Sequence, residues 1–547
     1  MPFLAEKRVP IPNKDILSWM FDERKFDQDK PVYIDAVDPA NSISANQAHA
    51  IIRKLAAGFQ AVGLQHGDCV CIHGFNSLYY PMLFLGIVAA GGVFAGSNPA
   101  YTKFELSHHF IASSTKLIIT EPEFLPAVLA AAKECGIQSS SILILDSQNE
   151  NIPSGYVSWK TLMEHGEKDW IRFNDEQVSR KTTAARLFSS GTTGLPKPAA
   201  VSHYNFIAQH TLVNEVHKTD YEPSRILYLP IFHAAMAPSA YIAPLRSGDA
   251  TYMLRRFEME PLLLSIQKYR LTELIVVPPV AVGVLKYPLT HKYSLKSVRV
   301  ILCGAGPLDK EHQSALQRVF GSEASFTQVW GMTETSCVAS KFYYPERDDT
   351  GSIGRMMPNL DVKIIDDDGK DISAFDVPGE LCIRGPTIIS EYFNTSQANK
   401  DSFDEEGYFR TGDVMYCDSK TKKWYIIDRK KELIKVRAFQ VAPAEIEGVL
   451  LSHPQILDAA VIGLQKKDDP QVEMPRGYVV RQPGPDNASL DEEAVKAFCG
   501  ARLAKYKALT GGVVFLEAIP RNATGKVLKR VLRDMAKAES DKNGAKL

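Results

Sequence analysis

The residues best suited to chemistry lie in a hydroxyl- and glycine-rich loop within RLFSSGTTGLPKPAAVSH, residues 186–203. Its serines and threonines supply hydroxyl donors, its glycines let backbone amides approach a ligand, and its lysine supplies positive charge. A loop that grips a pyrophosphate needs these groups. The candidate phosphate-binding residues are Ser189, Ser190, Gly191, Thr192, Thr193, Gly194 and Lys197.

This loop lacks the spacing of a Walker P-loop, G-x-x-x-x-G-K-[S/T]. The glycines are Gly191 and Gly194, and Lys197 is followed by Pro198 where the Walker motif has a hydroxyl residue. Clusters of Ser, Thr and Gly are also common in solvated turns. The loop alone therefore leaves two interpretations open, a phosphate cradle and an ordinary turn.

Six further segments follow the loop in a fixed order, and together the seven resemble the motifs of the adenylate-forming superfamily. They are LPIFHAAM (229–236), CGAGPL (303–308), TQVWGMTET (327–335), YFRTGD (408–413), IIDRKKELIKVRAFQVAPAEIE (426–447) and PRNATGKVLKR (520–530). The resemblance spans nearly the whole chain and is greatest to the group of 4-coumarate–CoA ligases and peroxisomal acyl-CoA ligases. It implies conversion of a carboxylic acid to a CoA thioester through an acyl-adenylate, with ATP, Mg²⁺ and coenzyme A.

Adenylation brings two anions together, so the site needs fixed positive charge to offset their repulsion. Lys526 resembles the family's catalytic lysine, which bridges the carboxylate and the α-phosphate. Thr333 resembles the family's α-phosphate contact, and Glu334 resembles the acidic residue that holds magnesium on the phosphates. A surface lysine in a basic helix is the alternative for Lys526.

The nucleoside half of ATP has its own matching residues. Asp413 resembles the carboxylate that accepts both ribose hydroxyls, and Arg429 matches the arginine that reaches the ribose and phosphate. The segment 304–306 is predicted to form a flat backbone ledge for adenine, through Gly304, Ala305 and Gly306. Trp330 stands where the family commonly has tyrosine, and we expect it to stack on the other face of the base.

The thioester step requires another arrangement, which this family reaches by rotating its C-terminal domain about a hinge. The hinge position falls on Lys431, and Lys435 and Gln440 match residues that contact the adenylate in the ligase group. His233 matches the histidine beside the reacting carboxylate, where it is predicted to gate entry of the pantetheine arm. A satisfied core histidine is its alternative.

The acyl pocket is predicted from the residues that follow His233 and Glu334 and from the edge of the adenine ledge. All are small or apolar: Ala234, Ala235, Met236, Leu302, Thr335, Cys337 and Val338. None of them pairs with a phenol hydroxyl, so an apolar medium-chain fatty acid or arylalkanoic acid is favoured over 4-coumarate.

Three positions depart from the family pattern. Pro198 replaces the glycine after the loop lysine and is expected to change the mobility of the loop without abolishing function. Ala438 replaces a glycine where the pantetheine arm passes, and Glu391 replaces a glycine in a local turn.

The elements that must position these residues alternate between apolar strands and helices. LIIT (117–120) and ILILD (142–146) flank the helical EFLPAVLAAAKECG, and TELIVVPPV (272–280) and VRVILCGAG (298–306) repeat the pattern. Such strands predict parallel sheets covered on both faces. From about residue 350, hairpin-like segments indicate a small β-barrel or antiparallel sheet. The predicted fold is α/β, with doubly wound sheets and a β-barrel in an N-terminal domain, 1–428, and a small α+β C-terminal domain, 429–547.

Composition and charge narrow the function classes. The 547 residues are 45% hydrophobic and 23% charged, a composition typical of a soluble globular protein, and the net charge of −1 gives no positive field for nucleic-acid binding. The eight cysteines form no CxxC pair, so reduced buried thiols are expected. The apolar run 81–96 is too short for a membrane span and predicts a buried helix, and no secretion signal is expected at the N-terminus.

The chain ends in Ala545-Lys546-Leu547, which is close to the peroxisomal S-K-L signal. The sequence therefore predicts a peroxisomal location through the import receptor, and an ordinary frayed tail on a cytoplasmic enzyme is the alternative.

Three other functions are open at this point. An adenylating enzyme that loads a carrier protein and a luciferase-like oxygenase share the first half-reaction. A non-catalytic acyl-AMP-binding protein is a different class, and the presence of Lys526, Glu334 and Asp413 argues against it.

Overall fold

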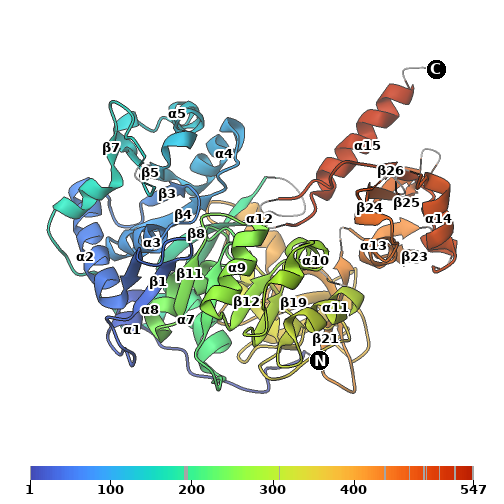
Figure 1. Cartoon of the computed structure of the whole chain (residues 1–547), viewed down its shortest axis with the longest axis horizontal. Helices are drawn as coiled ribbons and strands as arrows, with labels where there is room; N and C mark the ends of the chain where they lie inside the picture. Colours follow the sequence, from blue (N-terminus) through green and yellow to red (C-terminus); the bar gives the residue numbers. More distant parts are fainter. Residues whose placement is uncertain are drawn as a thin grey trace.

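The computed structural model describes residues 2–544 apart from 149, 190–194, 307, 309, 431, 437–438, 467–468, 485–486, 488, 504 and 523–524. Figure 1 shows a large body built from the N-terminal and central parts of the chain, with a smaller C-terminal body at its side. The last helix, α15 (Lys529–Gly544), packs against the smaller body through Leu532 and Ala536, and its C-terminal end projects beyond it.

The first of two seven-stranded sheets has the strand order β7-β6-β5-β3-β4-β8-β9. Neighbouring strands are parallel except for the β8–β9 hairpin. Its strands are β3 (Cys69–His73), β4 (Val93–Ser97), β5 (Thr115–Thr120), β6 (Ile142–Ile144), β7 (Val157–Ser158), β8 (Thr183–Ser189) and β9 (Lys197–Ser202). Every residue of β3 is buried, so helices must cover both faces. The helices packed around it are α2 (Ala45–Ala61), α3 (Tyr79–Ala89), α4 (Lys103–Ser113) and α5 (Leu125–Glu134).

The structure of the apolar run 81–96 differs from the prediction, which was a single buried helix. Helix α3 covers only its first part and ends at Ala89. Gly91 then turns the chain with φ of +85°, and Val93 begins strand β4. A left-handed turn that glycine adopts freely, followed by a buried strand, therefore divides the run into two elements.

The second sheet has the order β14-β13-β12-β10-β11-β1-β2 and is parallel apart from the β1–β2 pair. Its strands are β1 (Pro31–Asp35), β2 (Ser42–Ser44), β10 (Ser224–Leu227), β11 (Ala250–Met253), β12 (Glu273–Val276), β13 (Val300–Cys303) and β14 (Ser325–Gln328). Strand β12 ends earlier than the predicted strand 272–280 because Pro278 and Pro279 open helix α10 (Pro278–Lys286). The other helices near this sheet are α1 (Ile16–Phe21), α7 (His203–His210), α8 (Ala243–Ser247), α9 (Met259–Tyr269) and α11 (Lys310–Phe320).

Two small antiparallel sheets occupy the segment where a β-barrel or antiparallel sheet was expected. The first contains β15 (Trp330–Met332), β16 (Cys337–Lys341) and β17 (Arg355–Met356). The second contains β18 (Asp361–Ile365), β19 (Gly379–Arg384), β20 (Phe409–Cys417) and β21 (Trp424–Arg429). Two residues predicted to contact the nucleotide lie on β20 and β21. They are Asp413 and Arg429, which are opposite each other in the register of the two strands.

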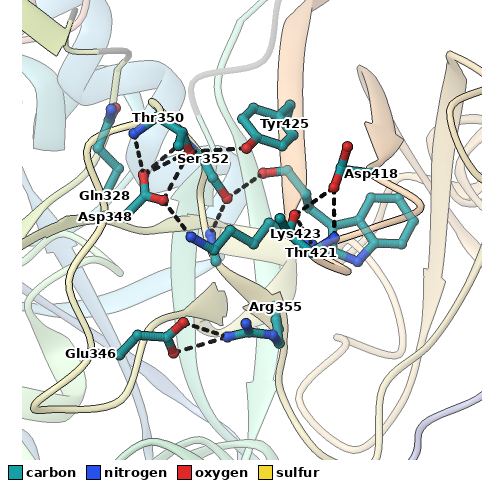
Figure 2. A network of polar contacts seen from close by, with 12 residues as sticks. Gln328, Glu346, Asp348, Thr350, Ser352, Arg355, Asp418, Thr421, Lys423 and Tyr425 are labelled. Carbon is teal, nitrogen blue, oxygen red and sulfur yellow. Dashed lines mark hydrogen bonds and ion pairs between the residues drawn. The ribbon is translucent and has the colours of Figure 1, made fainter.

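A polar network fixes the second small sheet to the rest of the large body (Figure 2). The fully buried carboxylate of Asp348 accepts a hydrogen bond from Lys423 Nζ at 2.8 Å, beside β21, and from the Thr350 and Ser352 backbone amides. The Thr350 and Tyr425 hydroxyls are 2.9 Å apart. A buried ion pair with these additional hydrogen bonds holds one geometry, which orients the strands that carry Asp413 and Arg429.

The C-terminal body has its own sheets, helices and core. Its elements are β22 (Ile434–Val436), β23 (Phe439–Val441), α13 (Pro443–Leu451), β24 (Ile456–Lys466), β25 (Asp469–Arg481), α14 (Glu492–Gly500), β26 (Val513–Phe515) and α15. Buried residues from Ile434 onward form two hydrophobic clusters separate from the large core of the first body. The predicted domain boundary, between 428 and 429, falls one residue before β21 ends.

The predicted α/β class, with a large N-terminal part and a small α+β C-terminal part, is confirmed. All eight cysteines have free thiols. Within the described ranges, no helix combines the length and apolarity needed to cross a bilayer.

Candidate active site

A continuous cavity of about 1670 Å³ lies between the two bodies and extends into the larger one. We call the part around Trp330, Asp413 and Lys526 the nucleotide end, after the predicted role of these residues. The part that runs from His233 past Leu302 is called the acyl end. Residues of both bodies line this cavity, so motifs that are far apart in the sequence meet in one space.

Asp413 is buried at the nucleotide end and is held from two sides. The indole Nε1 of Trp330 donates a hydrogen bond to its Oδ2 at 2.8 Å, and Arg429 Nε lies 3.5 Å from its Oδ1. Burial raises the pKa of Asp413, and Arg429 and the indole N–H oppose that shift. Trp330 was expected only to stack. The structure adds that its N–H orients the carboxylate, a function that the motif does not reveal.

The predicted adenine ledge also lines this end, through Gly304, Ala305 and Gly306. Ala305 has φ of +66°, in the left-handed region that non-glycine residues seldom adopt. A Cβ at Gly304 would lie 3.0 Å from Val329 Cγ2, so a larger residue would have to displace its neighbour. This strained, tightly packed backbone is typical of a ligand-binding loop.

Lys526 enters the cavity from the small body. Its turn packs against α10, because Gly525 has φ of +81° and a Cβ there would lie 3.2 Å from Pro279 Cγ. Burial and the Arg429 charge lower the pKa of Lys526 to about 8, although nearby carboxylates oppose the shift. These carboxylates are Glu432, Asp413 and Glu334. Lys526 is therefore a partly buried cation that faces Asp413 and Glu334 of the large body, not a surface lysine.

Glu334 and Thr333 are both buried and both line the cavity. Glu334 Oε1 accepts a 2.6 Å hydrogen bond from the Tyr392 hydroxyl, and its backbone carbonyl accepts one from Ile389. Tyr392 was not predicted, since nothing in its local sequence marks it as a partner of Glu334. The described residues contain no cluster of three or more metal-ligating side chains.

The phosphate loop connects β8 to β9, and its two ends line the cavity through Ser189 and Lys197. Lys197 Nζ lies 5.4 Å from the centre of the Tyr392 ring. The predicted residues Ser190, Gly191, Thr192, Thr193 and Gly194 lie outside the described residues. Pro198 pairs with Phe188 in the hairpin, and its carbonyl accepts a hydrogen bond from Phe393. The exposed Glu391 contributes its backbone carbonyl to Ala200.

His233 stands between the two ends of the cavity. Its Nδ1 accepts a hydrogen bond from the Ala235 backbone amide at 3.2 Å, which leaves Nε2 to carry the proton of the neutral ring. Burial, and secondarily the charge of Lys526, lower the pKa of His233 to about 4. The histidine is therefore neutral at physiological pH.

Lys435, predicted for the thioester step, is not among the residues that line the cavity in this arrangement. Lys435 is exposed on β22, where its backbone amide donates to Glu473 Oε2 at 2.8 Å. Gln440 pairs with Lys435 across the β22–β23 hairpin. The predicted hinge residue Lys431 and the substituted Ala438 lie outside the described residues.

Five of the seven residues predicted for the acyl pocket line the cavity, namely Ala235, Met236, Leu302, Cys337 and Val338. Ala234 belongs instead to the hydrophobic core, and the Thr335 hydroxyl is used within its own turn, where it donates to the Cys337 carbonyl. The acyl end continues past the predicted residues to a polar group that sequence reasoning missed, lined by Gln209, Asn214, Arg225, Glu273 and Lys341.

Two mostly parallel seven-stranded sheets, a small C-terminal body, and a lysine from that body facing buried carboxylates form the architecture of an adenylate-forming enzyme. The AMP-binding enzyme family matches residues 22–393, and the AMP-binding enzyme C-terminal domain matches residues 445–526. The chain belongs to the AMP-binding enzymes and is an acyl-CoA ligase, dependent on ATP and CoA.

The similar proteins include two from Aspergillus niger. The phenylacetyl-CoA ligase epaB is 51% identical over 98% of this chain and 99% of its own length, and the acyl-CoA ligase azaF is 52% identical over 97% and 100%. Among solved structures, ATP-bound MatB from Rhodopseudomonas palustris has a TM-score of 0.83 at 26% identity, covering 96% of this chain and 99% of that one. The anthranilate CoA ligase AuaEII shares the fold at a TM-score of 0.84, 20% identity, and coverage of 97% and 99%.

Proposed function

We propose that this acyl-CoA ligase acts on a medium-chain fatty acid or an arylalkanoic acid. The observation that carries the proposal is the cavity itself, which joins Lys526 and Asp413 to an apolar wall formed by Met236, Leu302 and Val338. Burial of each methylene against an apolar wall makes the binding free energy more favourable by about 0.8 kcal/mol, and burial of a hydroxyl without a partner makes it less favourable. The likeness to the phenylacetyl-CoA ligase epaB supports an arylalkanoic acid as one substrate.

In the first half-reaction, a carboxylate oxygen of the acid attacks the α-phosphorus of ATP, and pyrophosphate leaves. Lys526 is proposed to attract both anions, and Thr333 to contact the α-phosphate. Asp413 accepts the ribose hydroxyls in this proposal, with its orientation set by the Trp330 N–H at 2.8 Å. These groups are in place before the substrate arrives, which is the condition under which electrostatic stabilisation is most effective.

Magnesium is proposed to bind through Glu334. A buried carboxylate facing the cavity suits this ion, since magnesium commonly binds proteins through one or two carboxylates together with substrate phosphates. When bound, Mg²⁺ supplies positive charge that neutralises the phosphates. The Tyr392 hydroxyl, donating to Glu334 Oε1 at 2.6 Å, holds the carboxylate in position.

In the second half-reaction, the CoA sulfur attacks the acyl carbonyl, AMP leaves, and the thiol proton passes to water. We propose that the small body rotates about Lys431 for this step, withdrawing Lys526 and bringing Lys435 and Gln440 to the adenylate. The exposed position of Lys435 is compatible with a second face that is used only after rotation. His233, neutral and beside the carboxylate position, would admit the pantetheine arm.

An ATP-dependent thioester assay with a panel of acids tests the proposal. Aryl and alkyl acids should release AMP and form a CoA thioester when CoA is present, and should exchange pyrophosphate when CoA is omitted. Exchange without thioester formation would favour transfer to a carrier protein, and oxygen-dependent light emission would favour a luciferase-like reaction. Hydroxycinnamates as the best substrates of the panel would contradict the proposed acid class.

We also propose a peroxisomal location, which rests on Ala545-Lys546-Leu547, three residues outside the described part of the chain. A fluorescent fusion that leaves this end free should collect in puncta with a peroxisomal marker. Deletion of the three residues should return it to the cytosol without changing activity in vitro. A diffuse signal from the intact chain would contradict this proposal.

A further inference from the structure

The far part of the acyl end contains polar groups that the adenylation chemistry does not use. Gln209, on α7, is 1% exposed and lines the cavity. Neither its Nε2 nor its Oε1 has a hydrogen-bond partner among the described residues. Buried amides nearly always form hydrogen bonds, so an amide left without a partner beside a cavity points to a ligand.

Lys341 lies at the end of β16 and lines the same part of the cavity. Its Nζ donates to the Val213 carbonyl at 3.2 Å, one helical turn after Gln209, and lies 5.0 Å from the centre of the Tyr343 ring. It forms no ion pair with any residue that the structure describes. Since an ammonium group carries three donors, Lys341 retains hydrogen-bonding capacity for another oxygen.

The other charges nearby are already paired. Arg225 is buried and contacts Asp249 and Glu273, each at 2.8 Å. Tyr221 donates its hydroxyl to Glu273 at 3.1 Å. These groups therefore satisfy one another's charges and hydrogen bonds at the wall of the cavity. Lys341 and Gln209 differ from them, because their donors and acceptors are only partly used or unused.

The backbone at this end is also unusual. A π-helical turn, η4 (Thr211–Glu215), directly follows α7, and a second, η5 (Pro238–Ile242), follows the His233 segment. Residues of both turns, including Asn214 and Pro238, line the cavity. Turns of this kind are rare and occur frequently at functional sites, because the extra residue redirects side chains.

The polar group lies at a defined distance from the reacting end. Cys337, at the start of β16, donates through Sγ to the Ala235 carbonyl at 3.3 Å, beside His233. Lys341 is four residues further along this strand, or roughly 13 Å at about 3.3 Å per residue. A staggered carbon chain advances roughly 1.25 Å per bond, so an acyl chain of up to roughly ten carbons spans this length.

We propose that Lys341 and Gln209 form a subsite for an oxygen acceptor at the far end of the acyl chain. The preferred substrates are then carboxylic acids with an apolar middle and a remote carbonyl or carboxylate. This inference rests on the proposed acid–CoA ligase function and deepens it by naming the second polar group of the substrate. Specificity of this kind is strong, because an acid without the acceptor leaves the buried donors unpaired.

The test compares hexanoic, octanoic and decanoic acid with two analogues of each, one bearing a ketone on the penultimate carbon and one the dicarboxylic acid of equal length. At the best length, kcat/KM should be at least tenfold higher for one of the analogues than for the plain acid. Preference for the ketone identifies a neutral acceptor, and preference for the dicarboxylic acid identifies an anion. Lys341→Met should abolish the preference while leaving the plain acid as active or more active.

Lys116→Met is the matched control, since Lys116 also lies on a strand but is exposed and absent from the cavity lining. Gln209→Leu provides a second variant, expected to reduce the preference with a melting temperature close to that of the wild type. Plain acids converted at least as well as both analogues at every length, or a Lys341→Met variant that slows all three acids equally, would overturn the inference. Absence of thioester formation with every acid would instead contradict the proposed function.

Discussion

The two ends of the cavity differ in how their buried polar groups are satisfied. At the nucleotide end, Asp413 is held by Trp330 and Arg429, and Glu334 is held by Tyr392. At the acyl end, Gln209 has no hydrogen-bond partner among the described residues, and Lys341 contacts only one backbone carbonyl there by hydrogen bond. The nucleotide end therefore holds these carboxylates in place before a ligand binds, whereas Gln209 and Lys341 at the acyl end retain hydrogen-bonding groups that the described residues do not use.

This contrast teaches how one cavity can combine a fixed reaction with a selective substrate. Groups that stabilise developing charge are most effective when the protein already holds them in place. Groups that select a substrate act by the penalty they impose when the wrong ligand leaves them unpaired. Substitutions at the nucleotide end should therefore affect every acid alike, and substitutions at the acyl end should discriminate between acids.

The largest expected effect is at the nucleotide end. Lys526→Ala should slow adenylation by a factor of ~10² or more, because a preorganised charge is lost. Formation of thioester from supplied acyl-AMP should decline far less, since Lys526 is withdrawn in the proposed second step. Pyrophosphate exchange and single-turnover thioester formation measure the two steps separately.

Arg530→Ala is the control for this variant, because Arg530 is an exposed cation of the adjoining helix. It should leave both steps unchanged. Equal losses in the two half-reactions of Lys526→Ala would contradict the assignment.

A pH profile tests the same lysine without a substitution. The pKa of Lys526 is lowered to about 8, so its positive charge is lost as pH rises through that value. The kcat/KM for adenylation should therefore fall above about pH 8, with a slope that approaches tenfold per pH unit. We choose kcat/KM because its pH dependence reports the pKa values of the free enzyme. His233, with a pKa of about 4, stays neutral down to about pH 5, so its titration should not change the pH profile above that value.

Lys526→Arg should remove this alkaline limb, since a guanidinium stays charged throughout. A limb that persists unchanged in this variant would assign the titration to another group.

A smaller effect is expected from Trp330→Phe, which keeps a stacking ring but removes the donor to Asp413. Losing a hydrogen bond to a charged group costs about 1.5 kcal/mol, or roughly a tenfold rise in KM for ATP. The order of preference among acids should not change. Trp159→Phe is a close control, because Trp159 is fully buried and its indole N–H has no partner among the described residues. Similar rises in both variants would show that packing, and not the hydrogen bond, is responsible.

The same contrast explains which residues could be predicted from the sequence. Lys526, Glu334 and Asp413 each lie in a short motif whose residue types suit phosphate or ribose chemistry, so local sequence indicates them. Lys341 and Gln209 lie on β16 and α7, far apart in the chain, and only the folded sheets bring them to one cavity. No spacing of residues within either segment predicts that Lys341 and Gln209 lie near each other.

Side-chain direction was the other feature beyond reach of the sequence. Ala234 and Ala235 are neighbours in one motif, yet Ala234 faces the core and only Ala235 lines the cavity. The bond from Trp330 to Asp413 likewise depends on how two strands of different sheets are oriented. The division of the run 81–96 depends on a single left-handed glycine, Gly91, within an otherwise apolar segment.

The smallest effects are expected at the apolar wall of the acyl end, where Ala235→Phe fills space next to His233. Each methylene that the wild type buries is worth ~0.8 kcal/mol, or roughly fourfold in kcat/KM. For plain acids, efficiency should rise with chain length and then level off where the chain meets the polar group around Lys341. The added ring should move that optimum to shorter acids and leave the KM for ATP nearly unchanged, because the nucleotide end is untouched.

Ala234→Val is the matched contrast to this variant, because it adds volume to the adjoining residue but on the core side. It should lower the melting temperature by overpacking and leave the chain-length profile as it is. If Ala235→Phe kept the wild-type profile while Ala234→Val shortened it, the assignment of the two side chains would be reversed. If both profiles stayed unchanged, the acyl chain would have to leave His233 along a different wall, and the route past Cys337 to Lys341 would be wrong.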